Sequence, residues 1–355
     1  MKNLDDLKLI DKTDPKGMLG LIECFPGQCE KGRVIAKEFN LKPDYLEGRE
    51  IHNIMVTGLG GSAIGGDLLR TYLLNSLNIP ILVNRNYHLP LLVGKNTLLV
   101  TVSYSGNTEE TLSAYEEGKV KGAKIVALTS GGKLLENCKK DGVPALVIPG
   151  GLPPRASMGY QFTCLVGLLE KLGIINDKTL DFKETIDVLK SMFNGLNRAI
   201  PASKNLAKNI AEHLYGKVPV VYASQDLMDV AALRWKDQFN ENSKTYAVSN
   251  VFPELNHNEI VGWEVPGKIL KNFEVIFIRD KQEHPQVKKR FEITSGLIKD
   301  KASAIIEIWA KGECMLARLM SAIYLGDFVS VYLAILNGVD PLPVERIEAL
   351  KKQLV

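Results

Sequence analysis

Cysteine is scarce in this sequence and shows no metal-binding spacing. The 355 residues contain five cysteines, Cys24, Cys29, Cys138, Cys164 and Cys314, and no two of them form a Cys-x-x-Cys pair. This scatter excludes the common structural zinc sites, and nothing else in the chain indicates an oxidising compartment. The first residues also lack the uninterrupted apolar run of a signal peptide, because two acids follow Leu4 directly. We therefore expect reduced thiols and a cytoplasmic protein.

A strong net charge and long apolar runs are also missing. Lys and Arg number 44 against 41 Asp and Glu, which leaves a formal net charge of +3. That balance is too small for a nucleic-acid-binding surface or a polybasic membrane anchor. No stretch approaches the ~20 apolar residues that a membrane span needs. We therefore expect neither nucleic acid nor a membrane as a partner.

Short apolar runs alternate with helical stretches, which predicts an α/β fold with parallel sheets. The expected strands are 53–57, 79–83, 97–102, 124–128 and 145–148, then 218–223, 245–248, 275–278 and 304–308. A single core stops growing near ~250–300 residues, so we expect two domains, each a parallel β-sheet flanked by helices. Their expected bounds are residues 1–190 and 191–355. An apolar helix is expected over Met315–Leu336, with a short final helix after it.

A glycine-rich turn, Gly58–Asp67, follows the first expected strand. Such a turn lets backbone amides and a helix N-terminus approach an anionic ligand closely. Taken alone, it also fits the G-x-G-x-x-A fingerprint of a dinucleotide site. The acid that usually binds the ribose is absent, because Asn84 and Arg85 end the second strand. Arg85 is compatible with the 2′-phosphate of NADP, so an NADP-dependent oxidoreductase is one alternative.

The third expected strand runs into a second polar turn, Ser103–Thr108, with three hydroxyls and a glycine. Hydroxyls and the amides of a helix N-terminus are short donors that suit a phosphate dianion. Ordinary helix capping by Asn107, with Glu110 completing a capping box, is the alternative explanation. Capping explains Asn107 but not Ser103, Ser105 and Thr108 together. The turn therefore predicts a phosphate site at the carboxyl ends of the strands.

Five motifs in this order resemble the sugar isomerase (SIS) domain proteins, and within them the bifunctional phosphoglucose/phosphomannose isomerases of archaea and some bacteria. They are Gly58–Asp67, Ser103–Glu110, Pro153–Ser157, Asn240–Asn242 and Leu255–Glu259. The resemblance implies two SIS-type domains, a homodimer, and a sugar phosphate as substrate. It further implies interconversion of glucose 6-phosphate, and of mannose 6-phosphate, with fructose 6-phosphate through an enediolate. No cofactor is implied.

Glu241 is the expected catalytic base of this reaction. It ends an expected helix that begins near Leu227, where the negative end of the helix dipole disfavours a second negative charge. The pKa of a carboxyl group there should rise toward the range useful for proton transfer. A solvated acid at a helix end is the bland alternative, and the resemblance favours the base.

Arg155 and His257 are the next catalytic candidates. Two prolines precede Arg155, whose permanent charge suits an enediolate or a phosphate, although a surface arginine in a loop is the alternative. His257 lies in a polar segment, and a neutral imidazole can exchange a proton with a ring oxygen near neutral pH, although a structural histidine is the alternative. In the family, this histidine enters the active site from the other subunit, which is a further argument for a homodimer.

Several remaining assignments rest on the resemblance alone. Lys351 matches a lysine assigned to ring opening or phosphate contact, although Lys352 beside it is an equal candidate and a solvated lysine is the alternative. The family places Gly61 and Ser62 against sugar hydroxyls, and Ser103, Ser105 and Thr108 against the phosphate. No metal site is expected, because the His, Asp and Glu residues show no ligand spacing, unlike the zinc-dependent phosphomannose isomerases.

Other SIS proteins supply further alternatives. A non-catalytic sugar-phosphate sensor usually carries a DNA-binding domain, and the first ~50 residues here have neither its basic charge nor its helical pattern. An amidotransferring or deaminating relative is usually fused to a glutaminase with an N-terminal cysteine, whereas Lys2 stands at position 2. A ketohexulose phosphate isomerase has a single domain. The sequence therefore favours the bifunctional isomerase.

Overall fold

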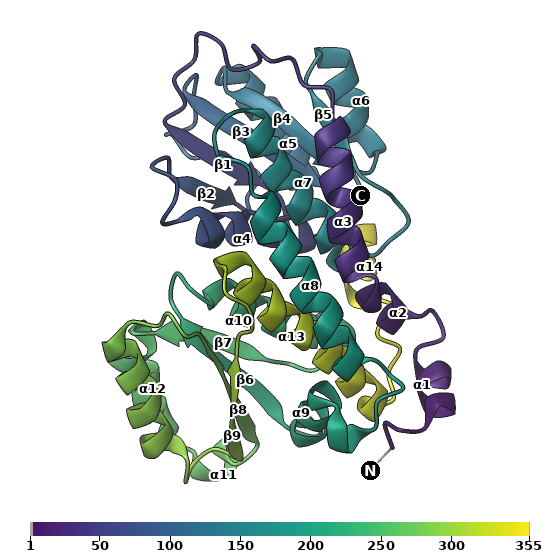
Figure 1. The fold of residues 1–355 in the computed structure, drawn as a ribbon, viewed down its shortest axis with the longest axis vertical. Helices are drawn as coiled ribbons and strands as arrows, with labels where there is room; N and C mark the ends of the chain where they lie inside the picture. Colours follow the sequence, from purple (N-terminus) through teal and green to yellow (C-terminus); the bar gives the residue numbers. More distant parts are fainter. Residues whose placement is uncertain (1–2, 355) are drawn as a thin grey trace. The chain divides into compact units, whose positions relative to one another are not determined.

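The computed structural model describes residues 3–354, so Lys2 lies outside the described residues (Figure 1). The chain forms two compact units. The first unit is Cys24–Ile186, and the second unit is the chain before Cys24 together with the chain after Ile186. Each unit contains one parallel sheet, which confirms the predicted α/β class.

The first unit has a five-stranded sheet in the order β2-β1-β3-β4-β5. Its strands are β1 (Asn53–Thr57), β2 (Ile81–Asn84), β3 (Thr97–Ser103), β4 (Lys124–Thr129) and β5 (Ala145–Val147). Its helices are α3 (Phe25–Glu38), η1 (Gly60–Ser62), α4 (Ile64–Leu73), α5 (Glu109–Val120), α6 (Gly132–Asp141), η2 (Pro154–Ala156) and α7 (Met158–Lys171). All seven residues of β3 are buried. Because Thr57 pairs with Thr101, the turns that follow β1 and β3 emerge at the same edge.

The second unit has a four-stranded sheet in the order β7-β6-β8-β9. Its strands are β6 (Val218–Ser224), β7 (Val248–Phe252), β8 (Phe273–Arg279) and β9 (Ala304–Trp309). Its helices are α1 (Leu7–Thr13), α2 (Met18–Glu23), η3 (Ala202–Lys204), α9 (Leu206–Leu214), α10 (Asp229–Gln238), η4 (Phe239–Ser243), η5 (Glu254–His257), η6 (Glu259–Trp263), α11 (Gly267–Leu270), α12 (Pro285–Ile298), α13 (Met315–Asn337) and α14 (Glu345–Gln353). Phe291 of α12 packs on Phe252 and Phe277 of the sheet, so this helix covers one sheet face (Figure 1).

Eight of the nine expected strands lie within two residues of their predicted bounds. The exception is β7, which was expected at 245–248 and begins only at Val248. The chain before it is tied to the end of the preceding helix, because the Thr245 amide donates to the Phe239 carbonyl at 3.1 Å. Lys244 turns the chain there with a φ of +54°. These features at the end of the helix explain why the strand begins later in the sequence than predicted.

The apolar helix α13 corrects one expectation from the sequence. It has 23 residues and is long and apolar enough, by length and composition, to cross a membrane. The prediction that no stretch approaches such a length is therefore wrong. Its apolar window is completely buried within the protein, and Gly338 ends the helix in the left-handed conformation. Burial on all sides explains why most residues on every face of the helix are apolar, as is usual for a helix at the centre of a protein core.

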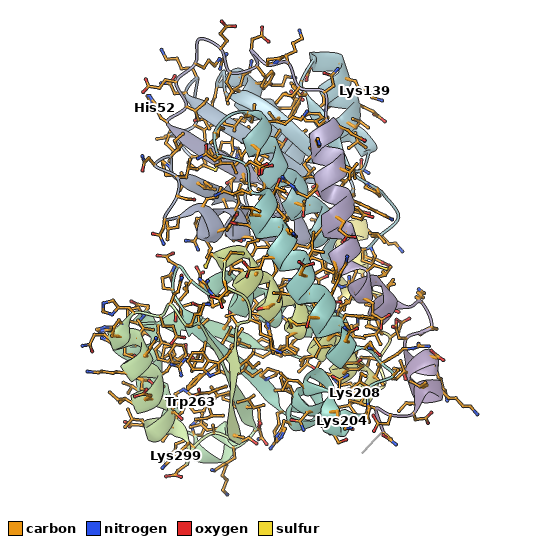
Figure 2. All side chains as sticks on the ribbon, in the orientation of Figure 1. His52, Lys139, Lys204, Lys208, Trp263 and Lys299 are labelled. Carbon is orange, nitrogen blue, oxygen red and sulfur yellow. The ribbon has the colours of Figure 1, made fainter. Side chains whose placement is uncertain are left out.

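The N-terminal residues group differently from the predicted domain of residues 1–190. The chain before Cys24 packs with the second unit, and the unit boundary at Ile186 falls inside helix α8 (Thr179–Leu196). Helix α2 contacts α13. The Asp5 carboxylate accepts from the ammonium of Lys208 at 3.1 Å, and the Lys208 side chain is fully buried (Figure 2). A buried ammonium needs such a partner, so Asp5 is held in place.

Candidate active site

The glycine turn after β1 lies in close contact with the turn that carries Arg155. A Cβ atom added at Gly61 would lie 3.0 Å from the Pro154 carbonyl carbon and 3.1 Å from the Arg155 amide nitrogen. At Gly58 it would lie 2.8 Å from the Val102 carbonyl oxygen. Glycine at both positions therefore lets the end of β3 and the Arg155 turn approach the end of β1.

The polar turn after β3 presents hydroxyls that do not cap helix α5. The N-cap residue of α5 is Thr108, and its side chain makes no capping bond. Asn107 accepts instead from the backbone amide of Lys133, at 3.1 Å. The capping explanation for this turn is therefore wrong. Ser103 donates to the Thr108 hydroxyl at 3.0 Å, and Ser105 is exposed, so the hydroxyls gather at the N-terminus of α5.

Gly106 allows the tight path of this turn. Its φ is +69°, and an added Cβ atom would lie 1.8 Å from the carbonyl oxygen of Gly131. The Gly106 carbonyl accepts from the Leu134 amide at 2.9 Å, so the first turn of α6 braces the loop. Ser62 is tied to the same place, because its hydroxyl accepts from the Tyr104 amide at 3.2 Å.

Two glutamine side chains hold the Arg155 turn in place by donating to its backbone carbonyl groups. Gln161 donates to the Pro154 carbonyl at 3.0 Å, and Gln28 donates to the Ala156 carbonyl at 2.7 Å. Arg155 itself is 4% exposed. A guanidinium keeps its charge even when it is buried, so the Arg155 turn adds a cation to the unit that carries the hydroxyls and the helix N-terminus. That set of groups suits a phosphate or another oxyanion.

The first unit carries Gly61, Ser62, Ser103, Ser105, Thr108 and Arg155 on turns that contact one another, and the roles of these residues in a site stay predictions. Arg85, which the oxidoreductase alternative requires for a 2′-phosphate, forms an ion pair with Asp67 in the first turn of α4. A carboxylate at that helix N-terminus disfavours a pyrophosphate. The structure therefore weakens the dinucleotide alternative.

Glu241 lies in the second unit on an unusual helical turn. Helix α10 changes at Phe239 into a single π-helical turn, Phe239–Ser243, and Glu241 is half-buried in the middle of it. π-Turns are rare and occur frequently at functional sites. Lys244 closes the turn, and its ammonium donates to the carbonyl of Glu241 at 2.6 Å and to that of Pro341 at 3.1 Å.

Buried polar bonds fix this turn to helix α13. Asp327 accepts from the Arg234 guanidinium at 3.1 and 2.8 Å and from the Gln238 amide at 2.9 Å. Burial raises the pKa of Asp327, although the guanidinium and the amide oppose this rise. One turn further along, Asn242 donates to the Ser330 hydroxyl at 2.9 Å and Ser243 to the Ser330 carbonyl at 2.6 Å. The backbone on both sides of Glu241 is thus tied to a rigid helix.

These anchors were not predicted from the sequence, although one signal was available. Asp327 and Ser330 interrupt an otherwise apolar helix, and a buried polar residue in such a helix needs a partner. Gln28 and Gln161 carry no comparable signal, because a glutamine on a helix is usually exposed.

His257 is exposed on a loop that is held firmly on both sides. Asn256 donates to the Thr294 hydroxyl at 2.9 Å and accepts from Arg290 at 3.2 Å, both on α12. Asn258 caps the next helical turn by accepting from the Glu259 amide at 2.6 Å. Within residues 3–354, the imidazole itself has no hydrogen-bond partner. The loop thus presents an ordered and unengaged imidazole to solvent.

Glu259 anchors the same loop to the sheet. Its two carboxylate oxygens accept from the Tyr222 hydroxyl and from the Asn250 amide. Trp263 donates to the Tyr222 oxygen at 3.1 Å and belongs to the same buried cluster. Burial, together with the Glu259 carboxylate, raises the pKa of Tyr222. This side chain therefore stays a neutral donor.

Lys351 and Lys352 lie on α14 in the second unit. Both side chains are exposed, and α14 buries none of its residues. Exposure therefore does not distinguish the two lysines, and the choice of Lys351 stays a prediction. Among residues 3–354, no group of three or more His, Cys, Asp or Glu side chains has the arrangement of a metal site.

Known proteins share these sequence and structural features. Residues 49–140 match the SIS domain, and residues 203–354 match the bacterial phospho-glucose isomerase C-terminal SIS domain. The bifunctional phosphoglucose/phosphomannose isomerase of Caldicellulosiruptor bescii is 46% identical, over 93% of this chain and 96% of that protein. The D-glucosamine-6-phosphate 4-epimerase of Sulfolobus acidocaldarius is 38% identical, over 57% of this chain and 61% of that protein.

A solved structure agrees in fold. Tagatose-6-phosphate ketose/aldose isomerase from Escherichia coli has a TM-score of 0.69 over 91% of this chain and 94% of that chain, at 14% identity. The match in fold confirms the predicted pair of SIS-type domains. With close to half of its residues identical to one isomerase over nearly its whole length, the chain belongs to the family of bifunctional phosphoglucose/phosphomannose isomerases.

Proposed function

We propose that this enzyme interconverts glucose 6-phosphate and mannose 6-phosphate with fructose 6-phosphate. The observation that carries the proposal is the polar turn after β3, whose hydroxyls at Ser103, Ser105 and Thr108 gather at the N-terminus of α5 without capping it. In the same unit, the Arg155 turn contacts the turn of Gly61 and Ser62. Hydroxyls, amides and a guanidinium together suit a sugar phosphate better than any neutral sugar.

Glu241 is the proposed base that moves a proton between C1 and C2. The charge that develops on the enediolate requires a cation, and Arg155 supplies one that cannot be deprotonated. His257 exchanges a proton with the ring oxygen when the sugar ring opens. Lys351 is the proposed contact to the phosphate or the opening ring. Both hexose 6-phosphates pass through the same enediolate, and because their C2 hydrogens lie on opposite faces of it, a single base serves both substrates when the enediolate turns either face toward Glu241.

The test is a coupled assay that starts from fructose 6-phosphate and follows glucose 6-phosphate and mannose 6-phosphate separately. We expect both products, with rates that EDTA leaves unchanged. Formation of neither product, or of an epimerised sugar alone, contradicts the proposed function. Loss of activity in EDTA that added divalent metal restores contradicts the metal-free mechanism.

We further propose a homodimer in which His257 completes the active site of the partner subunit. The support is the exposed imidazole on a loop whose neighbours Asn256 and Glu259 are fully engaged. An ordered loop of this kind holds an exposed side chain in a fixed position, where the surface of a partner subunit can contact it. We also propose that the enzyme acts in the cytoplasm, in glycolysis and gluconeogenesis. The free cysteines and the small net charge are compatible with that compartment.

A complementation experiment tests the shared site. Glu241→Gln and His257→Ala are each expected to be inactive alone. In a refolded equimolar mixture, half of the dimers pair one subunit of each kind, and one of their two sites has both wild-type groups. Activity should therefore return to about a quarter of the wild-type value. If both variants are inactive and the mixture stays inactive although mixed dimers form, His257 does not act across an interface.

A further inference from the structure

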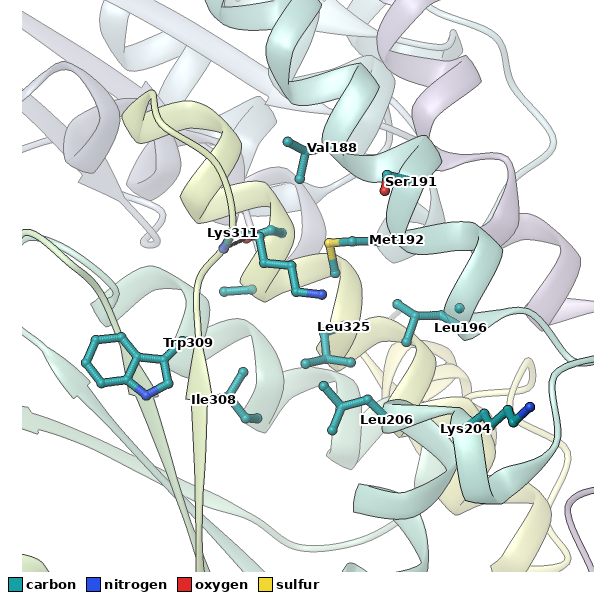
Figure 3. A pocket seen from close by; sticks show the side chains of 13 residues that line it. Val188, Ser191, Met192, Leu196, Lys204, Leu206, Ile308, Trp309, Lys311 and Leu325 are labelled. Carbon is teal, nitrogen blue, oxygen red and sulfur yellow. Dashed lines mark hydrogen bonds between the residues drawn. The ribbon is translucent and has the colours of Figure 1, made fainter.

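A hollow in the second unit is lined by none of the residues assigned to the reaction. Its volume is about 360 Å³, and helices α8, α9 and α13 line it together with the end of β9 (Figure 3). A volume of this size lies within the range of small-molecule sites, roughly 300 to 1,000 Å³.

The inner wall of the hollow is apolar. Its buried side chains are Met192, Leu196, Ile308, Ala322 and Leu325, each 8% exposed or less. Water against such a wall is unfavourable, and an apolar ligand that displaces it gains free energy. The hollow therefore favours a ligand with a hydrocarbon part.

The rim of the hollow is cationic. Lys204 and Lys311 are exposed, and Figure 3 shows them well apart, with the Lys311 side chain close to Met192 and Leu325 and the Lys204 side chain pointing away from Lys311. None of the lining residues is acidic, and among residues 3–354 neither ammonium forms an ion pair. The Lys311 backbone is fixed, because its amide donates to the Ser321 hydroxyl at 2.7 Å. Two ammonium groups without carboxylates favour an anionic ligand head.

We propose that this hollow binds an amphipathic anion, that is, a hydrocarbon chain of medium length with a carboxylate or phosphate head. The chain lies against Met192, Leu196 and Leu325, and the head lies at the rim beside Lys311. The rim alone would hold any small anion weakly, and the wall alone would hold any neutral hydrocarbon. Only a ligand with both parts uses the wall and the rim together. Sodium octanoate has both parts and serves as the probe.

Trp309 provides the readout, because its indole lines the hollow and is 49% exposed. The other two tryptophans, Trp235 and Trp263, are 1% and 6% exposed, so iodide quenches mainly Trp309. Octanoate is expected to protect Trp309 from iodide saturably, with a Kd below about 1 mM. Acetate, which lacks the chain, should not protect at the same concentrations, and 1-octanol, which lacks the charge, should protect at least about fivefold more weakly.

Three variants locate the binding. Lys204→Met with Lys311→Met should raise the Kd for octanoate about tenfold and change that for octanol less than about twofold. Gly195→Leu should weaken both ligands, because Gly195 lines the hollow and an added Cβ atom there has no neighbour within 4 Å. The last substitution also replaces a helical glycine with a better helix former, which should favour the helix. Lys299→Met, an exposed lysine outside the hollow, is the control (Figure 2).

Four results would overturn the proposal. They are the absence of saturable protection, equal protection by octanol and octanoate, an unchanged octanoate Kd in the double lysine variant, and full protection in Gly195→Leu. A rise in Tm with octanoate, which is absent in Gly195→Leu, would support it independently of the fluorescence signal. Isomerase activity is not a readout, so failure of the proposed function leaves this test intact.

Discussion

Glu241→Gln is expected to lower kcat by about 10³-fold while binding of fructose 6-phosphate stays within about twofold, because a general base contributes ~10²–10⁴-fold to proton transfer. Glutamine has the size of glutamate but cannot accept the proton. The π-turn keeps its anchors, since Asn242 and Ser243 still bond Ser330. Kinetics of isomerisation in both directions and a calorimetric titration with fructose 6-phosphate measure the two effects separately.

Asp237→Asn is the matched control for this substitution. Asp237 is also a carboxylate on the same helix, four residues earlier, and it is partly exposed beside Lys236. Its neutralisation should leave kcat within about twofold, because a surface ion pair of this kind contributes little. If Glu241→Gln kept a tenth or more of the wild-type kcat, another group would be the base. If it lost substrate binding instead, Glu241 would be a binding residue.

Gly106→Ala is expected to raise the KM for fructose 6-phosphate at least about tenfold, because loss of one or two charge-assisted hydrogen bonds to a phosphate costs that much. The added methyl group would lie 1.8 Å from the Gly131 carbonyl oxygen, so the Ser103–Thr108 turn must shift. The left-handed φ of +69° adds backbone strain. Steady-state kinetics and a thermal melt of the same preparation measure the loss of binding and the loss of stability.

Gly122→Ala separates the two causes. Gly122 has a nearly identical φ of +70°, but an added Cβ atom there has no neighbour within 4 Å. This variant should lose about 1 kcal/mol of stability from backbone strain and keep a wild-type KM. If the two variants had the same KM, the contact of the Gly106 turn with Gly131 would have no role in substrate binding.

Local patterns in the sequence determined much of the fold. Runs of buried apolar residues such as Thr97–Ser103 mark strands without reference to any partner, and eight strands were predicted within two residues. The motif order also identified the first-unit residues that the structure brings together, including Gly61 and Ser103. Such residues follow the carboxyl ends of parallel strands, so strand order alone places them at one edge. These features can therefore be predicted from residues that are close together along the chain.

Tertiary structure decided the features that depend on distant partners. Asn107 looks like a helix cap in the sequence, yet it bonds Lys133 because the Gly106 turn brings α6 beside it. Residues 3–23 pack with the second unit through contacts with distant residues, among them the ion pair of Asp5 with buried Lys208 and the contact of α2 with α13. The π-turn of Glu241 is stabilised by Ser330, nearly ninety residues away. Sequence periodicity indicates which side chains are buried. The hydrogen-bond partner of a buried polar group, however, is a group that lies close to it in three dimensions, and only the folded chain determines which groups are close.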